Sequence, residues 1–141
     1  MNIAFDLHGT IDVDPINMSN MMKALIDSNH NVSVMTGSEH TKAISELQNL
    51  DIYDYSEIYS IPEFLREVIN VPGRWIDGKW YCEDDFWWKS KAMMCEYYKI
   101  DILIDNMKEY GQYLSENTKF ILFDEDIDLN KVLIDFGVIE C

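Results

Sequence analysis

Short apolar runs alternate along this chain with segments of helical periodicity. The expected strands are residues 2–6, 31–35, 58–61, 100–104 and 119–123, and the expected helices are about 17–29, 39–50, 62–70, 91–98, 106–116 and 127–136. Strands separated by helices favour a parallel sheet with right-handed crossover connections. The pattern therefore predicts an α/β protein with a Rossmann-like three-layer fold around a central parallel sheet.

Residues 71–88 interrupt this alternation. The dipeptide Asp77-Gly78 lies between two aromatic-rich arms, which is the strongest short-range signal of a β-hairpin. We therefore expect a small hairpin insertion here. Its aromatic residues are Trp75, Trp80, Tyr81, Trp87 and Trp88. Most of these rings are expected to pack the hairpin against the sheet. One or two exposed rings would favour a nucleotide or a nucleic-acid end as ligand, because aromatic faces stack on bases.

The length and charge of the chain limit its partners. With 141 residues and no linker or internal repeat, the chain is expected to form a single domain over 1–141. Its net charge is −15. Duplex nucleic acid is therefore disfavoured as a partner, because phosphate contacts need Lys and Arg. An anionic small substrate would require a divalent cation or a local basic group to offset this charge.

The cysteines and the hydropathy pattern predict a compartment. Cys82, Cys95 and Cys141 are odd in number and form no Cys-x-x-Cys pair, so we expect reduced thiols and no structural zinc site. The N-terminus has no basic stretch before a long apolar segment, and no later run has the length needed to span a bilayer. We expect a cytoplasmic protein without a membrane partner.

Polar residues follow three of the expected strands. Asp6 follows Ile3-Ala4-Phe5, Thr36 follows the second strand, and Asp105 follows Ile102-Leu103-Ile104. Ligands of open α/β sheets bind beyond the carboxyl ends of the strands, so these side chains are expected to share one site. The turn residues that accompany them are Gly9, Thr10, Gly37, Ser38 and Asn106. We interpret Ser38 as the cap of the next helix and Ser90 as the cap of the helix that begins with Lys91.

This ordered set resembles the four motifs of the haloacid-dehalogenase-like superfamily of phosphatases. Those motifs are Asp-x-Asp-Gly-Thr after the first strand, a Thr or Ser after the second, a Lys, and an acidic motif after the fourth. The resemblance covers roughly residues 1–110 and implies the fold of that superfamily. Members of this superfamily often carry a cap domain, inserted either soon after the first motif or between the third strand and the lysine. The expected helix near 17 follows Thr10 almost at once, which leaves no room for the first insertion. The second insertion is at most the hairpin, so no full cap domain is expected.

The resemblance also implies roles for individual residues. Asp6 would attack phosphorus and form an aspartyl-phosphate that water later hydrolyses, which is covalent catalysis by a carboxylate. Thr36 and Lys91 would act with it. The residues implied to bind the phosphate are Gly9, Thr10, Thr36, Gly37 and Lys91. Asp6, the main-chain carbonyl of His8 and Asp105 would hold Mg²⁺, which prefers oxygen ligands. The expected activity is hydrolysis of a small phosphomonoester, a nucleotide among them.

Three positions leave alternatives open. His8 stands where the family has its second aspartate, and it either serves as the acid and base of the reaction or is tolerated with little turnover. Lys89 competes with Lys91 as the motif lysine. Asn106 replaces a frequent second acid, and Glu109 lies one helical turn further on as a candidate for a water-mediated metal contact. The alternative function is a degenerate relative that binds phosphate, metal or a protein partner without turnover.

Overall fold

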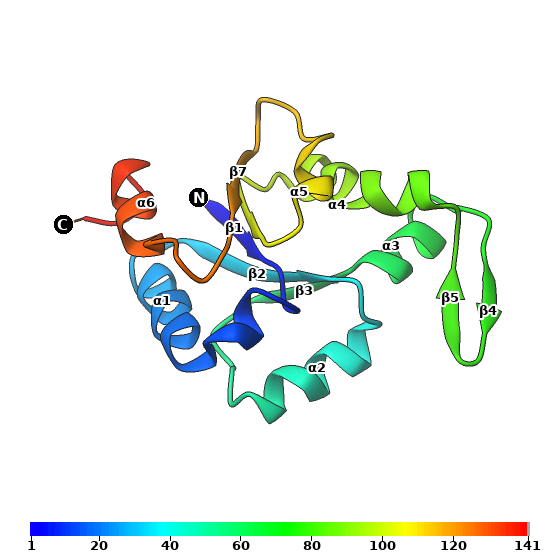
Figure 1. Cartoon of the computed structure of the whole chain (residues 1–141), viewed down its shortest axis with the longest axis horizontal. Coiled ribbons are helices and arrows are strands. Elements are labelled where there is room, and N and C mark those ends of the chain that lie inside the picture. The colour runs from blue at the N-terminus through cyan, green and yellow to red at the C-terminus, as the bar shows by residue number, and fades with distance from the viewer. Residues whose placement is uncertain (141) are drawn as a thin grey trace.

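The computed structural model describes residues 1–140 (Figure 1), so the expected reduced thiol of Cys141 lies outside the described residues. In chain order the elements are β1 (Asn2–Phe5), η1 (Ile11–Val13), α1 (Pro15–Asp27), β2 (Asn31–Thr36), α2 (His40–Asn49), β3 (Glu57–Ser60), α3 (Ile61–Glu67), β4 (Arg74–Ile76), β5 (Lys79–Tyr81), α4 (Asp84–Tyr98), β6 (Ile102–Asp105), α5 (Lys108–Gly111), β7 (Lys119–Leu122) and α6 (Leu129–Asp135).

Five strands form one parallel sheet in the order β3-β2-β1-β6-β7. The chain builds outward from β1 to one side through β2 and β3, then returns to the other side of β1 with β6 and β7. The point at which the strand order reverses therefore lies between β1 and β6. In open parallel sheets this is where a crevice forms at the carboxyl ends of the strands.

Both faces of the sheet are covered by helices, because its strands are apolar on both sides. Ile3 and Phe5 of β1 face a core that includes residues of α1, α2 and α6. Ala4 faces the opposite core, to which α3, α4 and α5 contribute. The predicted α/β class with helices on both faces of a parallel sheet is confirmed, and the strand order is compatible with a Rossmann-like fold.

The predicted hairpin is present as β4 and β5, which pair Trp75 with Trp80. Asp77 and Gly78 both have positive φ values, as the tight turn of a two-residue hairpin requires. In Figure 1 the hairpin projects from the body of the molecule. It is shorter than predicted, because α4 begins at Asp84. Two of the tryptophans expected in the hairpin therefore belong to this helix.

Three sequence predictions about helix ends were wrong. Ser90 lies inside α4 and its hydroxyl donates to the Trp87 carbonyl at 2.5 Å. The helix starts earlier because its first turn carries two acids, which favour a helix N-terminus. Glu39, not Ser38, occupies the N-cap position of α2. The helix expected to reach about residue 116 ends at Gly111, where a β-carbon would lie 2.6 Å from the Phe120 ring.

Two further expectations concern thiols and membranes. Cys82 and Cys95 are both free thiols, as predicted. Among residues 1–140, no helix combines the length and the apolar composition that crossing a membrane would need.

Candidate active site

The centre of the candidate site is a buried lysine between two carboxylates. Lys91 Nζ lies 2.9 Å from Asp6 Oδ1 and 2.5 Å from Asp105 Oδ2. Asp6 directly follows β1 and Asp105 ends β6, so both carboxylates lie where the strand order reverses. The Asp6 amide also donates to the Ile104 carbonyl at 2.9 Å, which ties the two strand ends together. Lys91 has no solvent exposure.

This cluster carries two carboxylates and one ammonium group, an excess of one negative charge when all are ionised. Burial raises the pKa of Asp6 to about 6, although the ammonium of Lys91 pulls it down, and the Asp105 carboxylate raises it further. Burial lowers the pKa of Lys91, but the two carboxylates outweigh this and hold it above its ordinary value. An additional positive charge beside the cluster would neutralise this excess.

Asn106 lies against two oxygens of the site. With its amide nitrogen turned inward, it donates to Asp6 Oδ2 at 2.8 Å and to the His8 carbonyl at 3.0 Å. The neighbouring Asp105 is engaged on both oxygens, since its Oδ1 accepts from the Met107 amide at 2.9 Å and its Oδ2 faces Lys91.

The turn after β1 depends on glycine for two reasons. Gly9 has φ +80°, and a β-carbon on it would lie 2.2 Å from the nearest atom of the Asn106 carboxamide. The Gly9 amide donates to Asp12 Oδ1 at 2.7 Å, so this predicted phosphate donor is already engaged. Thr10 Oγ1 is buried and has no hydrogen-bond partner within residues 1–140. A buried hydroxyl without a partner costs free energy.

The turn after β2 lies at the same edge of the sheet. Thr36 is buried, and its Oγ1 accepts a hydrogen bond from the Ser38 amide at 3.2 Å, which leaves its own proton free for another acceptor. A β-carbon on Gly37 would lie 3.1 Å from the Trp87 ring. Gly37 therefore packs directly against α4, one helical turn before Lys91.

His8 is paired with a glutamate that was not among the expected site residues. Its Nε2 contacts Glu46 Oε2, and Glu46 Oε1 accepts from Ser38 Oγ at 2.9 Å. Burial raises the pKa of Glu46, but hydrogen bonds from His8 and Ser38 outweigh it and lower the value overall. About half of the His8 side chain is exposed, so the ring lies at the surface and not in the core.

One aromatic ring packs against the Lys91 ammonium, and a second aromatic residue hydrogen-bonds to the first. Its Nζ lies 4.4 Å from the centre of the Tyr110 ring, and the Tyr110 hydroxyl accepts from Trp87 Nε1 at 2.9 Å. Trp87 was expected in the hairpin, and Tyr110 was not expected at the site. The spacing of four residues between Trp87 and Lys91 is the signal that would have placed them on one helical face.

The structure brings together most of the residues predicted for the site. Asp6, Thr36, Lys91 and Asp105 all lie at the carboxyl edge of the sheet. Lys89 lies on the surface and pairs with Asp85 at 3.1 Å, so Lys91 is the lysine that reaches Asp6. Glu109 lies in the first turn of the short helix α5.

Within the described part of the chain, no three His, Cys, Asp or Glu side chains gather into a group that could hold a metal ion. A different set of oxygens meets at Asn106, namely its own carboxamide oxygen, Asp6 Oδ2 and the main-chain carbonyl of His8. They suit Mg²⁺, which takes oxygen ligands and retains several waters.

Comparisons with protein-family models, with curated proteins and with solved structures give no match to this chain.

Proposed function

We propose that this protein is a Mg²⁺-dependent phosphomonoesterase of the haloacid-dehalogenase-like type, with a hairpin in place of a full cap domain. One observation carries the proposal. The buried ion cluster of Asp6, Lys91 and Asp105 sits at the strand-order reversal of a parallel sheet. A lysine without solvent exposure and two buried carboxylates are expensive to maintain for stability alone. Their position at a ligand-binding crevice supports a catalytic use.

Asp6 is the nucleophile in this proposal. A carboxylate oxygen of Asp6 forms a bond to phosphorus while the bond from phosphorus to the ester oxygen breaks. Lys91 keeps Asp6 charged and, with the Thr36 hydroxyl and the Gly37 amide, offsets the charge of the phosphoryl oxygens. Water then attacks phosphorus in the aspartyl-phosphate, which releases inorganic phosphate and restores Asp6.

His8 is the proton carrier. It gives a proton to the departing ester oxygen and takes one from the attacking water, so that the ring returns to its starting state. The contact between His8 Nε2 and Glu46 supports this role, because a carboxylate fixes the orientation of the ring and leaves Nδ1 for the substrate. The ring is half exposed, so solvent and a ligand have access to it.

The residues around Asn106 fit a magnesium ion. Asp6 Oδ2, the His8 carbonyl and the Asn106 carboxamide oxygen would hold it. The inward atom of the carboxamide lies 2.8 and 3.0 Å from the other two oxygens. Neighbouring ligands of an octahedral ion with bonds near 2.1 Å are about 3 Å apart. When bound, the ion would supply positive charge to the phosphoryl oxygens and offset the excess negative charge of the cluster.

The same carboxamide favours a second candidate function. With its nitrogen inward, Asn106 satisfies Asp6 and the His8 carbonyl without any cation. A degenerate relative that binds phosphate or a partner but does not turn over would keep this arrangement. The two candidates differ in which atom of the Asn106 carboxamide faces inward. The phosphatase would bind Mg²⁺ through the oxygen, whereas the degenerate relative would keep the nitrogen inward without a cation.

Hydrolysis assays separate them. We would measure phosphate release from an aryl phosphate and from nucleoside monophosphates, with Mg²⁺ and with a chelator, for wild type, Asp6→Asn and His8→Asp. The phosphatase proposal expects Mg²⁺-dependent release by wild type and none by Asp6→Asn. Release by His8→Asp alone would support the degenerate relative. Release by Asp6→Asn at the wild-type rate would exclude Asp6 as the nucleophile and contradict the proposal.

A further inference from the structure

A cavity of about 590 Å³ adjoins the candidate site on the side of the hairpin. Its walls come from β5 and the hairpin turn on one side and from the turn after β2 on the other. Gly37 and Trp87 line it and also pack against each other. Trp87 lies one helical turn before Lys91, so the cavity begins where the phosphate would sit. Ser38, which holds Glu46 and through it His8, is also part of the wall.

The hairpin is fixed in this position. The Arg66 guanidinium lies 4.8 Å from the centre of the Trp75 ring and 5.5 Å from that of Trp80. The same guanidinium donates two hydrogen bonds to Glu39, at 2.6 and 3.0 Å. Since Glu39 follows the turn after β2, Arg66 ties the hairpin to the phosphate side of the cavity. The cavity is thus a built part of the fold.

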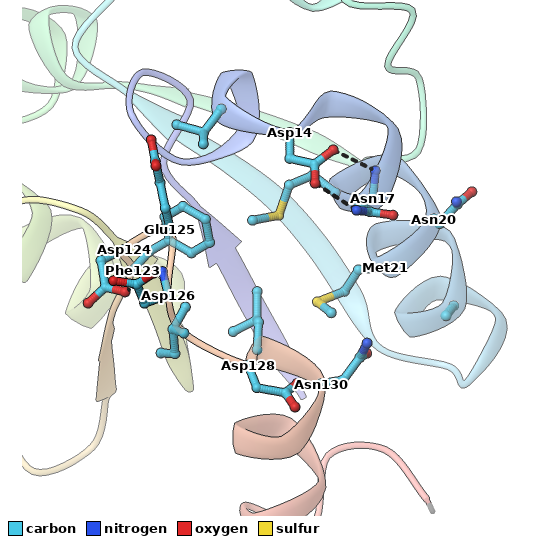
Figure 2. A pocket seen from close by; sticks show the side chains of 15 residues that line it. Asp14, Asn17, Asn20, Met21, Phe123, Asp124, Glu125, Asp126, Asp128 and Asn130 are labelled. Carbon is cyan, nitrogen blue, oxygen red and sulfur yellow. Dashed lines mark hydrogen bonds between the residues drawn. The ribbon is translucent and has the colours of Figure 1, made fainter.

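A second cavity, of about 890 Å³, lies between α1 and the loop that precedes α6 (Figure 2). Its walls carry the carboxylates of Asp14, Asp124, Glu125, Asp126 and Asp128. No Lys, Arg or His among residues 1–140 lines it. An anionic ligand is repelled from this groove, so a negatively charged leaving group would extend toward the hairpin.

The hairpin cavity, in contrast, has two lysines in its walls, one from each side. Lys42 comes from α2 and Lys79 from β5. Both are exposed, and neither forms an ion pair with another described residue. Asp77 and Asp84 also line the cavity, whereas the charge of Glu39 is met by Arg66. Tyr81 offers a half-exposed ring in the same wall.

We propose that the hairpin cavity binds the leaving group of the phosphomonoester and selects one that carries a second phosphate, held between Lys42 and Lys79. A nucleoside bisphosphate and a phosphorylated end of a single-stranded oligonucleotide share this chemistry. Either would place a base near the Tyr81 ring, on which it can stack. The inference rests on the proposed phosphatase function and adds the class of substrate to it.

Binding is tested first, without turnover. Cys82 lines the cavity and is partly exposed, whereas Cys95 is buried, so the rate of thiol alkylation at Cys82 reports occupancy. The experiment uses Asp6→Asn with Cys141→Ser. A nucleoside 3′,5′-bisphosphate is expected to slow labelling of Cys82 at concentrations at which the 5′-monophosphate and inorganic phosphate do not. Equal protection by the bisphosphate and the monophosphate, or none by either, would overturn the inference.

Kinetics then assign the lysines. In Lys42→Gln and Lys79→Gln, the ratio of kcat/KM for the bisphosphate to kcat/KM for an aryl phosphate is expected to fall about twofold to fivefold, as the loss of one exposed charge contact predicts. Lys23→Gln on α1 is the control and should leave the ratio unchanged. An unchanged ratio in both cavity variants would overturn the inference. If wild type hydrolyses no phosphomonoester at all, the proposed function fails, and the labelling result still decides whether the cavity binds.

The two ligand sources are separated in the same assays. Preference for the mononucleotide bisphosphate over a 5′-phosphorylated oligonucleotide would assign a small metabolite. The opposite preference would assign a nucleic-acid end. Both outcomes support the second-phosphate site, provided that the cavity lysines change the preferred substrate's kcat/KM.

Discussion

Lys91 Nζ lies 2.9 Å from Asp6 Oδ1, although 85 residues separate them in the chain. The pair joins the end of β1 to the middle of α4, and Asp105 completes it from β6. Three distant segments thus meet in one buried ion cluster, where removal of the lysine leaves two buried carboxylates without a cation.

Replacement of Lys91 should therefore cost stability. Lys91→Met leaves Asp6 and Asp105 facing each other without a cation, so the free energy of unfolding at pH 7 is expected to fall by about 3–5 kcal/mol. Urea denaturation followed by circular dichroism measures it. Lys89→Met is the matched control on the same helix, where an exposed ion pair contributes little, and a change within about 0.5 kcal/mol is expected. Equal losses in both variants would contradict the buried cluster.

Asp6 should make the protein less stable as the pH rises. Its pKa is about 6 in the folded protein and 3.8 in the absence of the fold, so the folded state binds the proton more tightly. Asp6 therefore favours folding at low pH, and this contribution declines between pH 4 and 6 by roughly 3 kcal/mol before it levels off.

Asp6→Asn removes this titration. Compared with wild type, the variant should gain stability progressively from pH 4 to 6 and remain more stable at pH 7, in the absence of Mg²⁺. Denaturation curves at several pH values give the difference between the two proteins, which cancels the other titrating groups. A difference that does not change with pH would show that Asp6 titrates normally.

Alanine substitutions at Gly9 and Gly78 separate the cost of a left-handed backbone from the cost of a steric clash. Both have φ near +80°, but only at Gly9 would a β-carbon meet another group. Gly78→Ala should cost about 1–2 kcal/mol, the usual penalty for the left-handed conformation. Gly9→Ala should cost more, because it also displaces Asn106, and it should weaken Mg²⁺ binding. Thermal denaturation of the two variants gives the difference, and identical costs would mean that Asn106 is free to move.

Asn106→Asp should strengthen Mg²⁺ binding. It replaces a neutral oxygen by a charged one and removes the amide nitrogen that competes for Asp6 and the His8 carbonyl. Calorimetric titration with MgCl₂ is expected to show a Kd about tenfold lower than that of wild type, since carboxylate count tunes affinity at such sites. Asn117→Asp, on an exposed turn, controls for net charge. If the two variants bind Mg²⁺ alike, Asn106 is not at the cation site.

Much of the fold could be predicted from local patterns. The apolar runs place the strands of the central sheet within one or two residues, and Asp77-Gly78 marks the hairpin turn. The convergence of Asp6, Thr36 and Asp105 follows from a general property of parallel sheets, whose strands all end at one edge. Helix ends were less predictable. The helix α4 begins before Trp87 and Ser90, which were expected to lie in a hairpin arm and at a helix cap.

The partners of the site residues depend on packing and were not predictable in the same way. Glu46 reaches His8 across 38 residues, and Asn106 reaches the His8 carbonyl because Gly9 leaves room for it. Neither contact has a local signature. They are set by how α2 and the loop after β6 pack against the turn after β1.

The most direct test of the account is to look for phosphate on Asp6. The protein is mixed with Mg²⁺ and a phosphomonoester that carries a radioactive phosphoryl group, quenched in acid, digested and analysed by mass spectrometry. The account predicts an acyl phosphate in the peptide that contains Asp6, present in wild type and absent in Asp6→Asn. Substrate hydrolysis by wild type with no labelled aspartate at any quench time, or with the label on another residue, would contradict it.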